Sequence, residues 1–520
     1  MSEQPPPSQV DRITSGYAFE GPALTLGAAV HDGAIVPDAV VRLPLGSMNR
    51  HGLVAGATGT GKTVTLQVMA EQLSAAGVPV FLADIKGDLT GLATPSAGHD
   101  KIDARMQGMQ QEWSPTAYPV EFLNLGGHGK GTPVRATVSS FGPVLLSKVL
   151  GLNATQESSL GLVFHYADKN GLALLDLKDL QAVVAHLVSD EGKGDLKGLG
   201  GLAASTAGVI LRQLIAFADQ GAQDFFGEPE FDTDDLIRTA EDGRGVITCL
   251  ELPGVRDKPV VFSTFLMWLL AELFQDLPEV GDPDKPTLVF FFDEAHLLFD
   301  DASKAFLDSV EQAVRLIRSK GVGVFFVTQT PRDVPAGVLG QLGNRVQHAL
   351  RAFTPEDAKA LKATVSTFPT SEYELGQVLT QLGTGEAVVT VLSERGAPTP
   401  VAWTMLRAPQ ATMGPSEEAV VDSALAASPL AGKYTETLDR ESAYEKLAAR
   451  LQKGAEEAAT DPAGDVQTEP ARRSRKAGPE EDSMIDKVVG SPAFKSMLRS
   501  AGTVLGREIS RGLFGTARRR

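Results

Sequence analysis

Eight consecutive residues near the N-terminal end carry the most specific chemistry of this sequence. They read Gly-Ala-Thr-Gly-Thr-Gly-Lys-Thr and follow the apolar stretch 53–55 directly. Glycines let the backbone curl so that N–H groups point at phosphate oxygens, and a helix that begins at such a loop attracts anions. Lys62 would reach the outer phosphates, and the Thr63 hydroxyl would be a ligand of Mg²⁺. The loop therefore predicts a nucleoside triphosphate site made of Gly56, Ala57, Thr58, Gly59, Thr60, Gly61, Lys62, Thr63 and Val64.

Two adjacent carboxylates supply a second element of this chemistry. Asp293 and Glu294 follow the apolar run 287–292, which has the composition of a buried parallel strand, and ligands bind at the carboxyl ends of such strands. We predict that Asp293 holds Mg²⁺ and that Glu294 orients and deprotonates the attacking water. An acidic pair can also simply favour a helix N-terminus. The complete phosphate loop favours the catalytic interpretation, because that loop needs such a partner.

Polar residues end two further apolar strands. Asp84 follows the run 80–83, and we treat it as a nucleotide-site residue on a second strand, since it lacks an acidic neighbour and lies only one helix after the phosphate loop. Gln329 follows the strand 323–327, where an amide can position water beside the γ-phosphate. A turn residue before Pro331 is the alternative for Gln329. Gly383 and Gly385 could approach the nucleotide, but a simple turn is favoured.

Several motifs together resemble the HerA/FtsK superfamily of motor ATPases, and most closely its bacterial HerA-like branch of the YjgR type. They are GATGTGKT, ADIKGD, FFFDEAHLLF, the helix with Arg315, Arg318 and Lys320, VTQTP, and LGNRVQHALRAFTPED. The resemblance covers about residues 20–408. It implies a RecA-like core with ATP as the nucleotide, a homo-oligomer in the form of a hexameric ring, and an arginine supplied to each site by a neighbouring subunit.

Four arginines are candidates for that role. Arg50 lies just before the phosphate-loop strand, where the family places a basic residue, and Arg318 looks like the family's sensor arginine. Arg345 and Arg351 lie after the Gln329 strand. Each could instead be an ordinary solvated surface residue. We favour Arg318 and Arg50.

Two functions remain open. The resemblance implies an ATP-driven DNA translocase or helicase, whereas a net charge of −17 argues against extensive DNA binding at the surface. The alternative is an ATP-dependent switch or protein-remodelling ATPase with no nucleic-acid substrate. Only about fifty residues precede the phosphate loop, where DNA-handling archaeal members of the family carry a small β-barrel. This departure weakens a direct transfer of DNA-end processing.

Composition and patterning define the expected organisation of the 520 residues. Apolar strands that alternate with helices predict an α/β fold with a parallel-rich central sheet. Cys249 lies in an apolar strand and is expected in the core. The start lacks the layout of a signal peptide, and the apolar run 260–271 is too short to cross a bilayer, so a cytoplasmic location is expected.

The expected regions follow from these patterns and from a change of composition to Ala, Glu, Ser and Pro from about Gly414. Residues 470–520 hold twelve Lys and Arg against five Asp and Glu, with apolar residues at helical spacing. The regions are a disordered N-terminus (1–18), the first part of the RecA-like core (19–141), an α-helical insertion (142–241), the second part of the core (242–410), a largely disordered linker (411–482) and a basic amphipathic helical tail (483–520).

Overall fold

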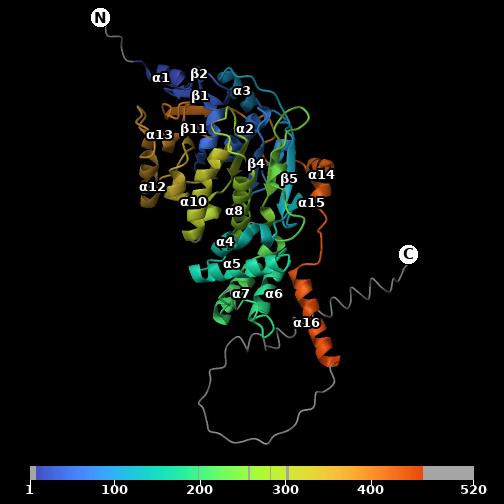
Figure 1. Cartoon of the computed structure of the whole chain (residues 1–520). Coiled ribbons are helices and arrows are strands. Elements are labelled where there is room, and N and C mark those ends of the chain that lie inside the picture. The colour runs from blue at the N-terminus through green and yellow to red at the C-terminus, as the bar shows by residue number, and fades with distance from the viewer. Residues whose placement is uncertain are drawn as a thin grey trace, which may run out of the picture. The chain divides into compact units, whose positions relative to one another are not determined.

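The architecture is built around one twelve-stranded sheet. The computed structural model describes residues 7–196, 198, 200–255, 258–281, 283–299 and 304–460. The strand order is β2-β1-β12-β11-β10-β3-β9-β8-β4-β7-β5-β6, as Figure 1 shows in part. The strands are β1 (Ala23–His31), β2 (Ala34–Pro44), β3 (Gly52–Ala55), β4 (Val80–Asp84), β5 (Val120–Leu125), β6 (Thr132–Val134), β7 (Ile247–Glu251), β8 (Leu288–Phe292), β9 (Val322–Thr328), β10 (Asn344–Gln347), β11 (Glu386–Thr390) and β12 (Ala402–Leu406). The expected α/β class with a mostly parallel sheet is confirmed.

Sixteen α-helices accompany the sheet in the described part of the chain. They are α1 (Gln9–Gly16), α2 (Lys62–Ala75), α3 (Asp100–Gly108), α4 (Val138–Val149), α5 (Ala154–Lys169), α6 (Leu177–Val188), α7 (Ala204–Asp219), α8 (Pro259–Asp276), α9 (His296–Phe299), α10 (Lys304–Ile317), α11 (Ala336–Leu339), α12 (Pro355–Val365), α13 (Leu375–Gln381), α14 (Glu418–Ala427), α15 (Ala431–Tyr434) and α16 (Ala443–Thr460). Chain contacts divide the molecule into two compact units. The larger comprises Met1–Gly151, Leu174–Leu177 and Ala216–Arg440, and the smaller comprises Leu152–Ala173, Lys178–Ile215 and Glu441–Arg520.

The parallel strands form the part of the sheet that positions the site. From β10 to β6 every neighbouring pair is parallel. All five residues of β8 are buried, which explains their uninterrupted apolar sequence, because strands covered on both faces have no solvent-facing positions. The rings of Phe81 and Phe290 lie 4.9 Å apart on adjacent strands. Aromatic packing thus fixes β4 beside β8.

Antiparallel strands extend the sheet beyond β10. Strands β11, β12, β1 and β2 pair antiparallel in succession. The N-terminus was expected to be disordered to residue 18, but residues 9–16 form helix α1, whose N-cap Ser8 completes a capping box with Asp11. The buried Tyr17 hydroxyl donates to the carbonyls of Val389 and Pro400. These contacts anchor the helix to the sheet. The expectation that the N-terminus is disordered is therefore wrong for residues 9–17.

Helices occupy most of the segment between β6 and β7. They include α5, α6 and α7, which Figure 1 shows grouped together. Within the smaller unit, the Tyr166 hydroxyl donates to Asp195 at 2.8 Å, and the Asp179 carboxylate accepts from the backbone N–H of Tyr444 at 2.9 Å. The structure therefore joins α6 to the start of α16, a long-range association that the local sequence patterns do not reveal.

The segment expected to be a largely disordered linker contains three helices up to residue 460. Helix α14 buries Val421, and α15 buries Tyr434, whose hydroxyl accepts from the backbone N–H of Asp232. An Ala- and Glu-rich composition concealed these few anchoring apolar residues. The expectation of disorder is thus wrong for 418–460, and the basic tail 483–520 lies outside the described residues. No helix in the described part of the chain is long and apolar enough to cross a membrane.

Candidate active site

The carboxyl ends of three neighbouring parallel strands bring the predicted catalytic groups to one edge of the sheet. Strand β9 pairs with β3 on one side and with β8 on the other. The N–H of Gly56 donates to the Thr328 carbonyl at 3.2 Å, and the N–H of Ala295 donates to the Val327 carbonyl at 2.9 Å. The exposed Gln329 leaves the sheet between the phosphate loop and the acidic pair. This is the position that the water-orienting hypothesis requires.

The conformation of the phosphate loop depends on its glycines. Gly59 and Gly61 have φ angles of +80° and +110°, a region that residues with a Cβ rarely adopt. Helix α2 starts at Lys62, and its N-cap Gly61 offers no side chain to the first N–H groups. Those unpaired N–H groups and the helix dipole suit a phosphate. The Lys62 ammonium donates to the Ala57 carbonyl at 3.3 Å, and burial lowers the pKa of this lysine.

Two residues outside the phosphate-loop motif, His348 and Gly385, contact the loop and the helix that follows it. His348 is fully buried, and its Nε2 lies 2.9 Å from the Thr65 hydroxyl. Burial lowers its pKa to about 4, so its imidazole is neutral at pH 7. The N–H of Gly385 donates to the Thr60 carbonyl at 3.1 Å. Gly385 therefore contacts the loop itself, beyond making the turn that we had favoured for it.

Asp293 has the environment of a metal ligand. Its side chain is fully buried, and its Oδ1 accepts from the N–H of Glu294 at 2.9 Å. Its Oδ2 accepts no hydrogen bond from any described residue. Burial raises the pKa of Asp293 to about 6, because a buried carboxylate loses hydration. A buried oxygen without a donor, beside a phosphate loop that includes Thr63, fits a divalent cation.

Glu294 is held between two basic side chains. Its Oε1 lies 2.6 Å from Lys86 Nζ, and its Oε2 lies 3.3 Å from His296 Nδ1. Burial acts to raise the pKa of Glu294, but the neighbouring positive charges, chiefly Lys86 and then His296 and Lys62, together lower the pKa. The carboxylate is therefore charged at neutral pH, as a water-activating group must be. The motif ADIKGD contains Lys86, yet nothing local in the sequence revealed this contact.

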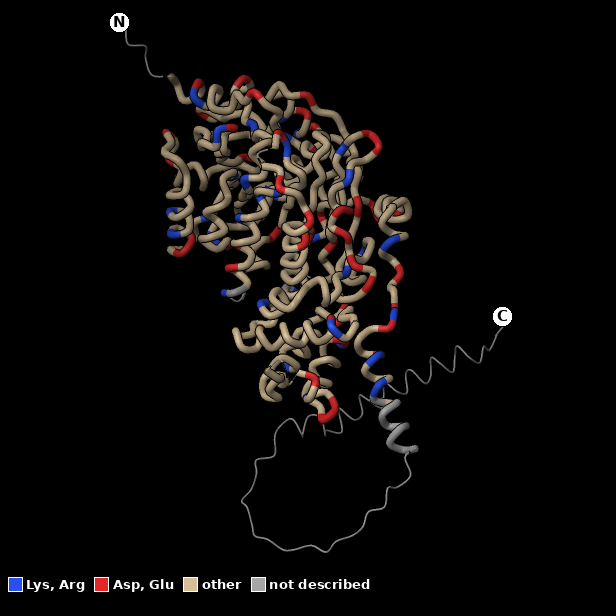
Figure 2. The backbone as a smooth tube through the Cα atoms, in the orientation of Figure 1, with Lys and Arg blue, Asp and Glu red and all other residues tan. Residues whose placement is uncertain are grey.

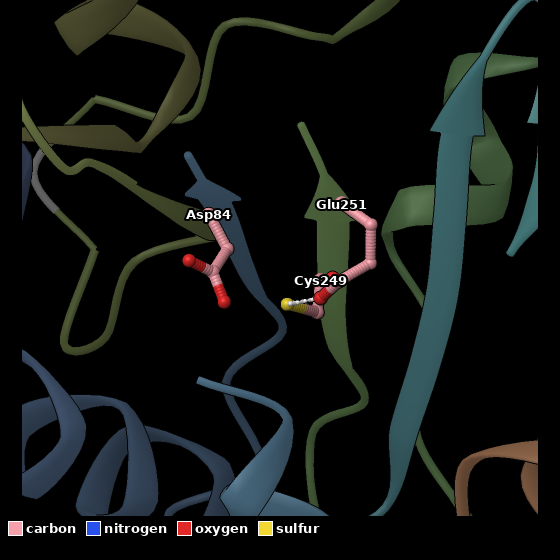
Figure 3. A group of neighbouring side chains, drawn as sticks. All are labelled: Asp84, Cys249 and Glu251. Atoms are coloured by element: carbon pink, nitrogen blue, oxygen red, sulfur yellow. Dashed lines mark hydrogen bonds between the residues drawn. The ribbon is translucent and has the colours of Figure 1, made fainter. Parts of the chain in front are cut away.

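Asp84 shapes the loop that carries Lys86. Its carboxylate accepts from the backbone N–H groups of Lys86, Gly87 and Leu89 at 2.7 to 3.1 Å. Figure 3 shows it beside Cys249 and Glu251 of the adjacent strand β7, and the potential ligand atoms of the three residues all lie within 4.8 Å of one another. The Cys249 thiol donates to Glu251 Oε1 at 3.3 Å. Asp84 thus anchors the loop, whereas the bond between Cys249 and Glu251 lies within β7.

The two favoured arginines lie at the opposite edge of the sheet. Arg50 ends the short helix Leu45–Arg50, two residues before β3 begins, and Arg318 precedes β9 on the short turn Arg318–Lys320. Burial and then the charge of Arg318 lower the pKa of His51, at the start of β3, so Arg318 is near that strand end. Strand β9 has seven residues, which at about 3.3 Å per residue separate its two ends by roughly 20 Å. Neither arginine is placed to reach the phosphate loop of its own chain.

The other two arginines lie elsewhere. Arg351 donates to the Thr58 carbonyl at 3.4 Å and is thus next to the phosphate loop. Arg345 donates to the carbonyls of Leu342 and Thr367. Of the four candidates, Arg351 is therefore placed to contact the phosphate loop of its own chain.

A small cavity opens beside the first turn of α2. Arg105 of α3 closes one side, and its guanidinium donates to the carbonyls of Leu406 and Thr384. The cavity is next to Gly61, so it lies within a few ångströms of the phosphate loop. Its lining residues are Leu26, Gly61, Val64, Thr65, Val68, Arg105, Gly385, Leu406 and Arg407.

Comparisons with known proteins agree with this geometry. The family model described as "Helicase HerA-like C-terminal" matches residues 32–520. The unbound bacterial conjugative coupling protein TrwBdeltaN70 has a TM-score of 0.51 and 16% identity, covering 78% of this chain and 95% of its own. The plasmid coupling protein TrwB in complex with ADP and Mg²⁺ has a TM-score of 0.51 and 16% identity, covering 76% and 97%. No curated protein matches. At this identity the likeness to TrwB establishes the fold alone.

Proposed function

Because the chain belongs to the family of HerA-like helicase C-terminal domains, we propose that it hydrolyses ATP at the carboxyl ends of β3, β9 and β8. One observation carries this proposal: three features lie at the same ends of these strands. They are the phosphate loop, a buried Asp293 oxygen that accepts no hydrogen bond, and the charged carboxylate of Glu294. The TrwB structure with ADP and Mg²⁺ supports the nucleotide and the ion.

Each group has a defined role in this reaction. The loop N–H groups and Lys62 bind the phosphates, and Thr63 and Asp293 would hold Mg²⁺, which neutralises charge on the phosphate oxygens when bound. Glu294 accepts a proton from the attacking water, and Gln329 orients that water. Both side chains leave the sheet at the edge where the γ-phosphate of a loop-bound nucleotide would lie.

We further propose that the active unit is a ring in which a neighbour completes each site. Arg50 and Arg318 lie at the sheet edge opposite their own phosphate loop. In a head-to-tail ring, that edge of one subunit can face the loop of the next. An arginine there would stabilise the negative charge that develops on the transferred phosphoryl group.

A DNA translocase is the function we favour for this ring, on the strength of the family. The alternative, a protein-remodelling ATPase, draws support from the net charge of −17 and from Figure 2, in which Lys and Arg positions are interspersed with Asp and Glu along the described chain. ATPase rates measured with and without double- and single-stranded DNA, together with the mass in solution, test both. Stimulation by DNA of a ring supports the translocase. Turnover of a ring that DNA does not change would favour the alternative.

We further propose that the nucleotide base binds at the small cavity beside α2, which has room for about one water molecule and would have to widen as the base enters. Val64 points into it from the first turn of α2, and a base linked to loop-bound phosphates must lie within one ribose of that turn. We expect Val64→Phe to weaken ATP binding about tenfold, about 1.4 kcal/mol, by filling the cavity. Affinity for inorganic triphosphate should stay unchanged, because that ligand has no base. Competition binding with both ligands measures the difference.

Two variants complete that experiment. Val64→Ala leaves the cavity open and should bind ATP as the wild type does. Lys62→Ala should weaken both ligands. Equal losses of ATP and triphosphate in Val64→Phe would show that the change disturbs the loop and would refute the cavity as the base site.

A further inference from the structure

We propose that Lys86 is a positioning residue for hydrolysis, which holds the Glu294 carboxylate where it can activate water. The inference rests on the proposed ATPase function and adds to it a residue from the loop after β4, a strand that leads neither to the phosphate loop nor to the acidic pair. It is drawn from three observations: the contact itself, the anchoring of the lysine backbone, and the conformation of Glu294.

The contact is short and partly shielded from solvent. Lys86 Nζ lies 2.6 Å from Glu294 Oε1 and 3.8 Å from Asp293 Oδ2. The Glu294 side chain is 12% exposed and that of Lys86 is 37% exposed. Salt screens fully exposed ion pairs, which contribute little, but it screens partly buried pairs much less. The ion pair therefore restrains the position of the Glu294 carboxylate.

The backbone of Lys86 is fixed by the sheet. Strands β4 and β8 pair so that Ala83 lies opposite Phe292. The chain segments that carry Lys86 and Glu294 thus leave the sheet side by side. Three backbone N–H groups of the loop 85–89 bind the buried Asp84 carboxylate, and Gly87 takes a φ of +74° to allow the turn. A lysine on a free loop would lose backbone entropy as well as side-chain entropy on pairing, but here the backbone is already ordered and only the side-chain rotamers remain to be fixed.

Glu294 needs an external partner to hold its orientation. Its φ of +46° is uncommon for a residue with a side chain, but the backbone does not by itself fix the rotamer of the carboxylate. Its Oε2 has His296 as neighbour at 3.3 Å, without a hydrogen bond of good geometry. The ion pair with Lys86 is thus the best-defined contact of this carboxylate among the described residues. Removing it should allow the group to rotate away from the water.

The test compares Lys86→Met, which keeps the length of the side chain and removes the charge, with Lys86→Arg, which keeps the charge. We expect Lys86→Met to lower kcat about 10- to 100-fold, since small misplacements of a reacting group cost this much. The Kd for ATP should change less than about twofold, because Lys62 and the loop bind the phosphates. Lys86→Arg should recover part of kcat. Lys130→Met is the matched control, because it removes an exposed lysine that pairs with Glu418, and its kcat should equal that of the wild type.

A double-mutant cycle separates positioning from other roles. In single-turnover measurements, Lys86→Met should cause no further loss in a Glu294→Gln background, since it acts through that carboxylate. An additive loss, a weakened Kd for ATP, or a wild-type kcat in Lys86→Met would each overturn the proposal. Melting temperatures establish that the variants are folded, and if Lys86→Met is not, Lys86→Gln takes its place in the cycle. An inactive wild type would refute the proposed function itself, and this inference with it.

Discussion

Glu294→Gln should bind ATP with nearly wild-type affinity and lose most turnover, with kcat lower by roughly 10²- to 10⁴-fold, the usual contribution of a general base. The amide keeps the shape of the side chain but cannot accept a proton from water. It also loses the charge that pairs with Lys86. ATP binding measured by equilibrium titration, and phosphate release measured under saturating ATP, separate the two effects.

Lys62→Ala is the complementary variant, because it should weaken ATP binding as well as turnover. Its ammonium is buried against the Ala57 carbonyl, where the phosphates would replace that contact. Hydrolysis at the wild-type rate by Glu294→Gln would show that another group activates the water. In that case the assignment of β8 as the catalytic strand is wrong.

The catalytic edge of the sheet could be predicted because its strands are buried on both faces. Strands β3, β8 and β9 are fully buried and appear in the sequence as short, largely apolar runs that lead into the phosphate loop, the acidic pair and Gln329, respectively. The family prediction is confirmed by a match over residues 32–520. Chemistry and local pattern coincide here, so sequence reasoning located Lys62, Asp293 and Glu294 on the elements where they lie.

The antiparallel part of the sheet could not be predicted in this way. Strand β2 contains Pro37 and Asp38, and β10 has four residues of which three are polar, so neither has a clear apolar pattern. Strand β10 pairs with β3, which is far away in the chain, and β1 pairs with the equally distant β12, as with Gly27 and Leu406. Non-local pairing of this kind leaves little trace in a local window of sequence.

The same limit explains why Lys86 was missed. Its partner Glu294 is about two hundred residues away, and only the order of the strands, β8 beside β4, brings them together. Gly385 and His348 likewise reach the phosphate loop through β11 and β10. The residues that contact the substrate must be of particular types at particular spacings, so a sequence motif can identify them. The residues that support them are brought close only by the order of the strands, which a motif does not contain.

The second prediction with a large expected effect concerns the two favoured arginines, Arg318 and Arg50. Arg318→Ala should fold and bind ATP but lose about 10³-fold or more in kcat, the usual contribution of an arginine that acts on a transferred phosphoryl group. Arg50→Ala should behave similarly if both residues act from the neighbouring subunit. Strand β9 separates Arg318 from the phosphate loop of its own chain, so neither loss has a simple explanation within one subunit.

Mixing two inactive variants tests whether the site is shared. A ring containing Arg318→Ala and Lys62→Ala subunits has interfaces in which an intact loop meets an intact arginine, roughly one interface in four for random equimolar mixing. ATPase activity should therefore reappear on mixing, after subunits have exchanged. Mixing Lys62→Ala with Glu294→Gln is the matched control and should restore nothing, because both changes lie in the same half of the site. Solution mass shows whether each variant still forms the ring. Wild-type turnover by both Arg318→Ala and Arg50→Ala would exclude the two arginines and leave Arg351, beside the phosphate loop of its own chain, as the best-placed remaining candidate.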